Sequence, residues 1–281
     1  MAKRVIIFST LLAVVVSGIL IVRLAINSAE AQAVDDKSKP VRQLPDLPNS
    51  GLDRFTDNIA FGLGEKLSFD INYGFINAGI AAMEVADVTE YNNRPCYQII
   101  STANSNKFFS SFYRVEDKIE SIVDAAGIYS WRFDKQLSEG TYRAHRTYEF
   151  DQLIHKVFYD KDTIDVAPYV QDALSVLYYV RTQELKVGQS IFVDNFTDGK
   201  KYPMEVKVHR KESIRVKAGK FDCIVVEPLL LTSGIFKNEG KLTVWLTDDR
   251  LKLPVLMKSR VLVGSISAEL TDYKLGEILD F

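Results

Sequence analysis

Lys66-Leu67-Ser68-Phe69-Asp70-Ile71-Asn72-Tyr73 is the stretch that decides the fold, because apolar and polar side chains alternate along it. Successive side chains of a β-strand point to opposite faces, so the alternation predicts a strand with one buried face and one wet face. The same period recurs in Tyr113, Val115, Ile119 and Val123, with charged residues between them. The pattern therefore indicates β-structure from about residue 64 onward.

Strand-like runs continue to the end of the chain and are separated by short turns. They lie near residues 76–88, 96–103, 128–134, 141–150, 153–159, 190–196, 202–208, 220–231, 241–247, 254–263 and 265–274. Short returns are typical of an antiparallel meander. We predict an all-β fold, a curved antiparallel sheet or partly closed barrel of about a dozen strands. Residues 224–231 are apolar on both parities except for Glu227, which predicts a strand covered on both faces.

One helix is predicted, over residues 168–185. Pro168 suits the first turn of a helix, and Gly188 follows soon after the predicted end. At roughly 100° per residue, one broad arc collects the apolar side chains. These are Val170, Ala173, Leu174, Val176, Leu177, Val180 and Leu185. The helix is therefore expected to pack on the sheet.

The start of the chain resembles an export signal. Lys3 and Arg4 precede the uncharged run 5–22, and residues 29–33 (AEAQA) offer two A-x-A cleavage sites. The run is also long enough, at about 18 residues, to span a membrane. Residues 1–33 are thus a cleaved signal peptide or an N-terminal anchor of the inner membrane. No cysteine follows either site, which excludes a lipoprotein signal.

The remaining chain divides into a linker, one domain and a tail. Residues 34–63 contain Pro40, Pro45 and Pro48 and form the predicted linker, 64–276 the all-β domain and 277–281 the tail. Beyond residue 33, the 35 basic and 37 acidic side chains fall to 32 and 36, a net charge of −4. A weakly acidic domain without a basic stripe argues against nucleic acid as a partner.

Cys96 and Cys223 are the only cysteines, and both lie in strand-like apolar stretches. In an oxidising compartment they could pair if their Cα atoms came within about 7 Å. The alternative is two separate buried thiols that behave as small apolar side chains.

No motif points to catalysis. The chain has neither G-x-S-x-G nor H-E-x-x-H, and His145 and His155 do not face each other in the hairpin expected there. We therefore predict a protein that is not an enzyme, with no catalytic residue, metal or cofactor. A site assembled from distant strands would escape this reasoning, so an unrecognised hydrolase remains the third interpretation.

Arg181 is the most informative single residue, because it projects from the centre of the apolar arc of the helix. A buried guanidinium needs a partner. It either pairs with Glu184 and a nearby carboxylate, or lies at the mouth of a pocket and binds an anionic head group. The candidate ligand-binding residues are Arg181, Asp172, Gln171 and Ser175 on the predicted helix, with Phe108 and Phe109 at an aromatic rim.

Several segments together resemble the bacterial exported family known as domain of unknown function 3108. They are residues 64–70 (GEKLSFD), 79–81 (GIA), 171–175 (QDALS), 178–181 (YYVR), 216–222 (VKAGKFD), 245–249 (WLTDD) and 253–255 (LPV). The resemblance spans roughly residues 62–276 and brings no established activity with it. The C-terminal part is also similar in architecture to periplasmic half-barrels of the lipoprotein-carrier type, which implies a sheet and helical lid around an apolar cavity.

The sequence thus predicts a periplasmic or envelope-associated binding protein that holds a hydrophobic or lipid-like ligand. The alternative is a non-catalytic structural or interaction module that docks to an envelope protein. A direct membrane contact is expected only through residues 5–22, if they are not cleaved. The two interpretations differ in whether the space beneath the helix is open or filled.

Overall fold

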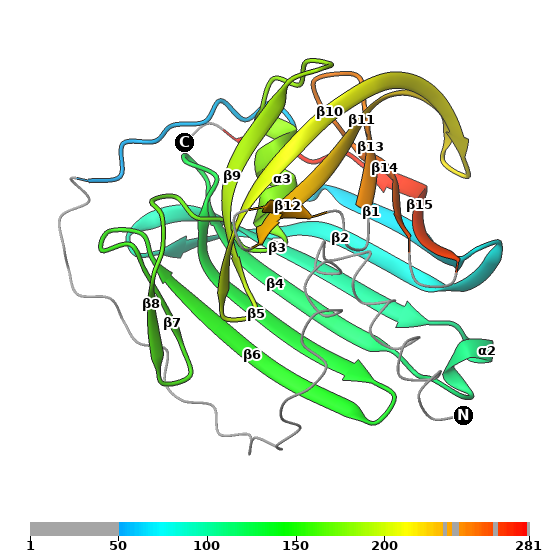
Figure 1. The fold of residues 1–281 in the computed structure, drawn as a ribbon, viewed down its shortest axis with the longest axis horizontal. Coiled ribbons are helices and arrows are strands. Elements are labelled where there is room, and N and C mark those ends of the chain that lie inside the picture. Colours follow the sequence, from blue (N-terminus) through cyan, green and yellow to red (C-terminus); the bar gives the residue numbers. More distant parts are fainter. Residues whose placement is uncertain (1–50, 233–234, 238–241, 261–263, 280–281) are drawn as a thin grey trace.

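The computed structural model describes residues 51–279, apart from 233–234, 238–241 and 261–263. Its strands form one antiparallel sheet with the order β8-β7-β6-β5-β4-β3-β2-β1-β15-β14-β13-β11-β10-β9, and β12 pairs with β11 (Figure 1). The strands are β1 (Lys66–Tyr73), β2 (Ile76–Tyr91), β3 (Arg94–Ser105), β4 (Glu116–Asp124), β5 (Ser130–Glu139), β6 (Tyr142–Asp151), β7 (Lys156–Tyr159), β8 (Asp162–Asp165), β9 (Ser190–Thr197), β10 (Lys200–Val216), β11 (Gly219–Thr232), β12 (Ile235–Lys237), β13 (Leu242–Thr247), β14 (Pro254–Arg260) and β15 (Ser265–Lys274). The predicted fold class is confirmed.

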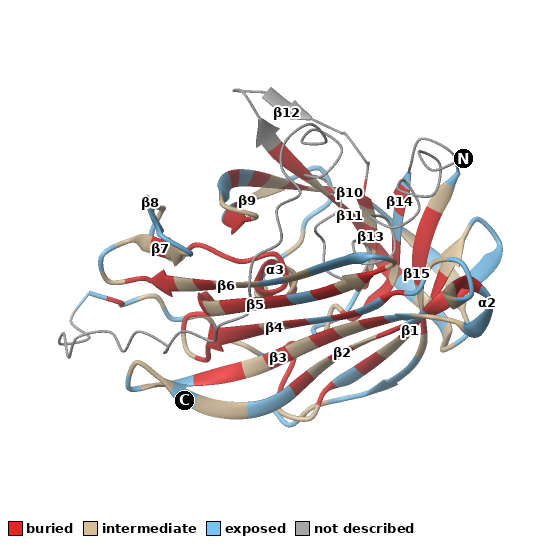
Figure 2. Cartoon of the chain, turned by 90° about the horizontal axis from the view of Figure 1, so that it is seen from below, coloured by how far each residue is buried: buried red, intermediate tan, exposed pale blue. Residues whose placement is uncertain are grey.

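The alternation in β1 has the predicted consequence. Leu67, Phe69 and Ile71 are buried, whereas the residues between them are only partly covered. Along the strands of the curved sheet, buried residues are interspersed with partly covered and exposed ones (Figure 2). In β11, residues 223–227 are buried on both parities, as expected for a strand covered on both faces.

The sheet curves without closing strand to strand, and a short extended segment links its two arms. The Gln171 N–H donates to Asp194 O at 2.9 Å, and the Phe196 N–H donates to Gln171 O at 2.8 Å, both on the edge strand β9. The Ser130 N–H of β5 donates to Val170 O at 3.4 Å. Gln171 therefore satisfies backbone groups that the open edge of β9 would leave exposed, and Val170 joins the same segment to β5.

The predicted helix begins later and ends earlier than expected. Helix α3 comprises Ser175–Thr182, not 168–185. Pro168 lies outside it, because Val170 O accepts from β5 and the backbone of Gln171 bonds to β9, so neither residue supplies a helical hydrogen bond. A second helix, α2 (Lys107–Ser110), is a single turn that the sequence pattern does not predict. Helix α3 lies in the hollow of the curved sheet, between its two arms (Figures 1 and 2).

The folded domain starts before Gly64, the boundary predicted from sequence. Leu52 and Phe61 are buried, although both fall in the predicted linker. At the other end, Glu277 exchanges two backbone hydrogen bonds with Leu63, at 2.8 and 2.9 Å. Gly62 permits this approach, since a Cβ there would lie 2.0 Å from the Glu277 carbonyl oxygen. The residues flanking the sheet thus belong to the same packed unit.

The predicted signal or anchor, residues 1–33, lies outside the described residues. Within the described ranges, none of the helices has the length and apolarity required to cross a bilayer.

Cys96 and Cys223 are both free and buried, so the structure shows two thiols and not the disulfide. Cys96 lies on β3 and Cys223 on β11, with five strands between them in the sheet order. Burial raises the pKa of the Cys223 thiol to about 12, and burial likewise raises the pKa of Cys96. Both groups are therefore inert towards electrophiles near neutral pH.

We expect iodoacetamide to leave the native protein unmodified and to add two groups once guanidinium unfolds it, as measured by intact-protein mass spectrometry. The reason is that burial removes both access and thiolate character. If the unfolded chain accepts iodoacetamide only after reduction, the protein contains the disulfide instead.

Candidate functional site

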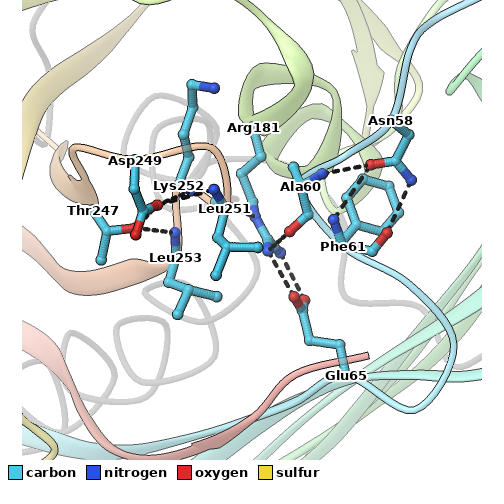
Figure 3. Close-up of polar contacts among 10 residues, drawn as sticks. All are labelled: Asn58, Ala60, Phe61, Glu65, Arg181, Thr247, Asp249, Leu251, Lys252 and Leu253. Carbon is cyan, nitrogen blue, oxygen red and sulfur yellow. Dashed lines mark hydrogen bonds and ion pairs between the residues drawn. The ribbon is translucent and has the colours of Figure 1, made fainter. Parts of the chain in front are cut away.

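Arg181 is the most heavily bonded side chain of α3. Its Nη1 and Nη2 donate to the two carboxylate oxygens of Glu65, both at 2.7 Å (Figure 3). Its Nη2 also donates to Ala60 O at 2.9 Å, and its Nε donates to Leu251 O at 3.1 Å. The side chains of Arg181 and Glu65 are 0% and 1% exposed. This is a buried, bidentate ion pair with further backbone acceptors.

Two tight turns hold the carbonyl groups that face Arg181. Asn58 Oδ1 accepts from the N–H groups of Ala60 and Phe61, at 3.1 and 3.3 Å. Asp249 Oδ1 accepts from the Leu251 N–H at 2.9 Å, in the loop before β14 (Figure 3). Side-chain turns of this kind fix a short segment without regular secondary structure. The acceptors are therefore in place around the guanidinium.

The surroundings keep Arg181 charged. Burial lowers the pKa of its guanidinium, but the charge and hydrogen bonds of Glu65 outweigh burial and leave the pKa raised. The rings of Phe61 and Tyr178 lie 5.5 and 5.2 Å from the guanidinium carbon. Of the two predicted roles, the geometry is that of a structural ion pair. The partner is Glu65, however, and Glu184 pairs instead with Lys186 at 2.9 Å.

A signal for Glu65 was present in the sequence. Glu65 shares its parity with Leu67, Phe69 and Ile71, so the strand pattern places it on the buried side. An acidic residue on the apolar side of one strand and an arginine on the apolar arc of a helix are natural partners. The pair spans 116 residues, which is why local spacing did not reveal it.

Asp172 is a second buried charge centre, just before α3. Its carboxylate accepts from the hydroxyls of Ser121 and Ser130, the latter at 2.6 Å, and from the N–H groups of Leu174 and Ser175, at 2.7 and 2.8 Å. Within the described chain no cation pairs with it. Burial raises the pKa of the Asp172 carboxyl, and the hydrogen bonds that it accepts offset this only in part.

Gln171 and Ser175 are buried with Asp172 and also hold the chain in place. Gln171 Nε2 donates to Ile128 O at 2.7 Å, and the Asp172 N–H donates to Ser175 Oγ at 2.9 Å. Together the three residues tie the start of α3 to β4, β5 and the turn between them. The structure therefore brings Gln171, Asp172 and Ser175 together, with Arg181 two turns further along α3.

The apolar side of α3 also borders a cavity of about 70 Å³ beneath β10, β11, β13 and β14. Every residue that lines it is apolar, including Leu177 and Val180 of α3, Met204 of β10, Val244 of β13 and Met257 of β14. None of the six predicted ligand-binding residues lines this cavity. The sequence pattern predicts the apolar arc of the helix. It does not predict which residues of that arc border a cavity and which pack against other side chains.

The two predicted rim residues diverge. Phe109 is buried, and its N–H donates to Asn106 Oδ1 at 2.9 Å, whereas Phe108 is 68% exposed. Both belong to α2, which lies at one end of the sheet, away from the cavity beneath α3 (Figure 1). The predicted site residues thus fall into two separate regions.

The described residues contain no group of three or more side chains arranged to hold a metal ion. His145 and His209 lie on different strands and are each hydrogen-bonded to one carboxylate, Asp134 at 2.8 Å and Glu227 at 2.7 Å.

Replacing Arg181 by alanine should lower the free energy of unfolding by about 3–5 kcal/mol, because Glu65 would keep a buried charge without a partner. Chemical denaturation measures this loss. The double variant R181M/E65L should recover much of it, since neither charge then remains. As a matched control, Arg114→Ala removes an exposed pair with Glu116 and should change stability by at most about 1 kcal/mol. Similar losses for R114A and R181A would contradict the buried-pair assignment.

Asp172→Asn should alter the pH dependence of stability. The folded pKa of Asp172 lies above its unfolded value of about 3.9, so ionisation costs more in the folded state. The contribution of Asp172 to the free energy of unfolding is therefore fully present below the unfolded pKa. It is lost as the pH rises through the folded pKa. Relative to wild type, D172N should gain stability over this range, measured as unfolding free energy at a series of pH values.

The control for this experiment is Asp165→Asn. The hydrogen bond from Lys156 lowers the pKa of the exposed Asp165 carboxyl, so D165N should show the opposite sign. A difference between D172N and wild type that does not vary with pH would refute the assignment.

The comparisons with known proteins concern the family and the fold. The sequence pattern of the family described as "Protein of unknown function (DUF3108)" matches residues 68–271. No curated protein matches the chain. A solved structure from Brucella abortus, a β-barrel-like protein of the domain of unknown function DUF1849, has a TM-score of 0.55 at 12% identity, over 78% of this chain and 100% of that one. At this identity the likeness concerns the fold alone.

Two further solved structures are more distant. A Parabacteroides distasonis protein, described provisionally as a lipoprotein, has a TM-score of 0.34 at 13% identity, over 79% of this chain and 100% of that one. A Bacteroides fragilis protein, described provisionally as exported, has a TM-score of 0.30 at 11% identity, over 79% of this chain and 99% of that one.

The family match covers most of the sheet, from β1 to β15. This chain therefore belongs to the DUF3108 family, whose function is unknown.

Proposed function

We propose that this domain is a non-catalytic binding module of the cell envelope, whose cavity beneath α3 takes up the end of an apolar chain, such as an acyl chain. The observation that carries the proposal is the cavity itself, because its lining is apolar throughout. An apolar cavity excludes water and gains free energy when a hydrocarbon group enters it. No chemical step is part of the proposal.

The size of the cavity limits the ligand. A volume of about 70 Å³ is small beside ordinary ligand pockets, which begin near 300 Å³. It accommodates a few methylene groups and no more. Met204 and Met257 line the cavity, and the unbranched methionine side chain adapts to neighbours more easily than other apolar residues. Rotation of these two side chains would lengthen the cavity along the inner surface of β10 and β14.

Helix α3 supplies a fixed wall for such a site. The Arg181–Glu65 pair fastens one face of the helix, and the hydrogen bonds of Asp172 fasten its start. The cavity lies against neighbouring apolar side chains of the helix, among them Leu177 and Val180. Binding would then displace strand side chains and leave the helix in place. Because Arg181 is committed to Glu65, the proposal gives it no part in holding an anionic head group.

The envelope location rests on the start of the sequence. Lys3, Arg4 and the uncharged run 5–22 have the pattern of an export signal or anchor. In either case the domain would face the periplasm.

The alternative function, a structural or interaction module, has one observation in its favour. Much of the hollow beside α3 is filled, since the ring of Phe61 packs against Tyr97 and Tyr178 with centroids 5.4 and 4.8 Å apart. A domain whose interior is filled by its own aromatic residues would act through its surface. The third interpretation, a hydrolase, has no such supporting observation in the described chain.

Filling the cavity should abolish binding without harming the fold. We expect the fluorescent fatty acid cis-parinaric acid to bind the wild-type protein and Val244→Phe to weaken binding at least tenfold, because the added ring occupies the space of the ligand. Fluorescence titration measures the affinity, and thermal melting checks the fold. The control is Val187→Phe, an exposed position outside the cavity lining, which should bind as wild type does. Equal affinity in V244F and wild type would remove the cavity from consideration and favour the interaction module.

A further inference from the structure

One end of the sheet gathers exposed apolar side chains from two segments. Asn106, which precedes α2, donates its N–H to Ala78 O at 2.9 Å and its Nδ2 to Asn77 O at 2.7 Å. These bonds hold α2 beside the turn between β1 and β2, and both lie at the same extremity of the molecule (Figure 1).

The side chains at this extremity face solvent to an unusual degree. Phe75 in the turn is 98% exposed, Phe108 is 68% and Phe112 is 57%, and the β2 residues Ile76 and Ile80 are 49% and 59% exposed. We call these five residues the aromatic end. Single exposed apolar residues are ordinary, but a cluster of this size marks an interaction site.

The aromatic end is rigid. Phe109 is buried beneath it, and the rings of Phe108 and Phe112 lie 5.6 and 5.4 Å from the Phe109 ring, while Phe108 and Phe112 are 5.4 Å apart. Asn106 Oδ1 accepts from the Phe109 N–H at 2.9 Å and fixes the single turn of α2. The exposed rings are thus presented by a fixed base, which lowers the entropy lost on docking.

Cationic side chains surround the aromatic end. Lys107 is exposed in α2, and Arg260 is exposed across from Ser265, whose carbonyl accepts from the Gly74 N–H of the β1–β2 turn at 2.8 Å. Among the described residues, Lys107 and Arg260 make no ion pair. Arg114 is also exposed there, and it pairs with Glu116 at 2.6 Å. Within the described part of the chain, two cations therefore lie next to the apolar residues without an acidic partner.

The geometry points to a lipid surface as the partner: the aromatic end docks on an anionic bilayer, with Phe75, Phe108 and Phe112 in the interfacial layer and Lys107 and Arg260 against the head groups. Exposed aromatic rings flanked by basic side chains are the combination that interfacial membrane binding uses. A protein partner would require a shape match that a protruding tip does not define. This surface is separate from the cavity beneath α3 and goes beyond the proposed function.

The test places a reporter at the surface of the full chain. In F108W, tryptophan emission should shift to the blue on addition of vesicles containing phosphatidylglycerol, and brominated phosphatidylglycerol should quench it. The matched control is F55W, because Phe55 is 70% exposed and lies by Ala126 at the opposite end of the sheet. Its emission should not be quenched. Trp131 and Trp245 emit in both variants, so the difference between F108W and F55W is the local signal, and an insertion of residues 5–22 into the bilayer does not by itself give it.

Neutralising the charges tests the choice of lipid. In the F108W background, K107S and R260S should each weaken docking roughly fivefold, because a basic side chain near an anionic surface contributes about 1 kcal/mol. Pure phosphatidylcholine vesicles should quench little. V244F, which fills the cavity, should leave quenching at position 108 unchanged, so a failure of the proposed function would be recognised separately.

Three outcomes would overturn the inference. The first is equal quenching at positions 55 and 108, and the second is quenching that ignores lipid charge. The third is a blue shift that appears without vesicles and depends on protein concentration, which would assign the aromatic end to a second copy of the chain.

Discussion

The buried contact between Arg181 and Glu65 is the constraint on which the arrangement of this domain depends. It joins α3 to the residue just before β1, and the same guanidinium reaches the carbonyl groups of Ala60 and Leu251. Three segments distant in sequence, around residues 60–65, 181 and 251, therefore meet at one cation. Because ions inside a protein are stable only with complete hydrogen bonding, each of these segments must be in place for the others to be. The position of α3 in the hollow of the sheet follows from this requirement.

The second constraint is the extended segment before α3. Residues 170–172 occupy the space between the arm that ends in β9 and the arm that contains β5, and they bond to both. A sheet of this size would otherwise leave long edges open to other chains. The same three residues deliver Asp172 to the serines of β4 and β5. The same short segment thus links the two arms of the sheet and starts the helix.

Most of the fold could be predicted from the sequence, because alternation along strands such as β1 has a direct physical meaning. The helix boundaries could not be. Val170 suits the apolar arc of a helix, yet it suits equally a buried extended segment, and only the backbone bonds of Val170 to β5 and of Gln171 to β9 decide between the two. Arg181 was correctly expected to require a partner. The partner, Glu65, lies 116 residues earlier in the chain, so local spacing could not identify it. Phe108 and Phe109 differ in exposure although they are neighbours, since successive side chains of a helix point about 100° apart.

The pairing of β1 with β15 has a consequence for the order of folding. Lys66 lies opposite Lys274, so the centre of the sheet joins the first strand to the last. During synthesis from the N-terminus, β1 can pair with β2 early. The other edge of β1 stays unpaired until β15 has been made. Contacts of such long range form slowly, and unpaired strands invite aggregation meanwhile. In this topology the edge of β1 is paired only when β15, near the end of the chain, has been made. A chaperone that covers β1 until then would prevent its premature pairing with other chains.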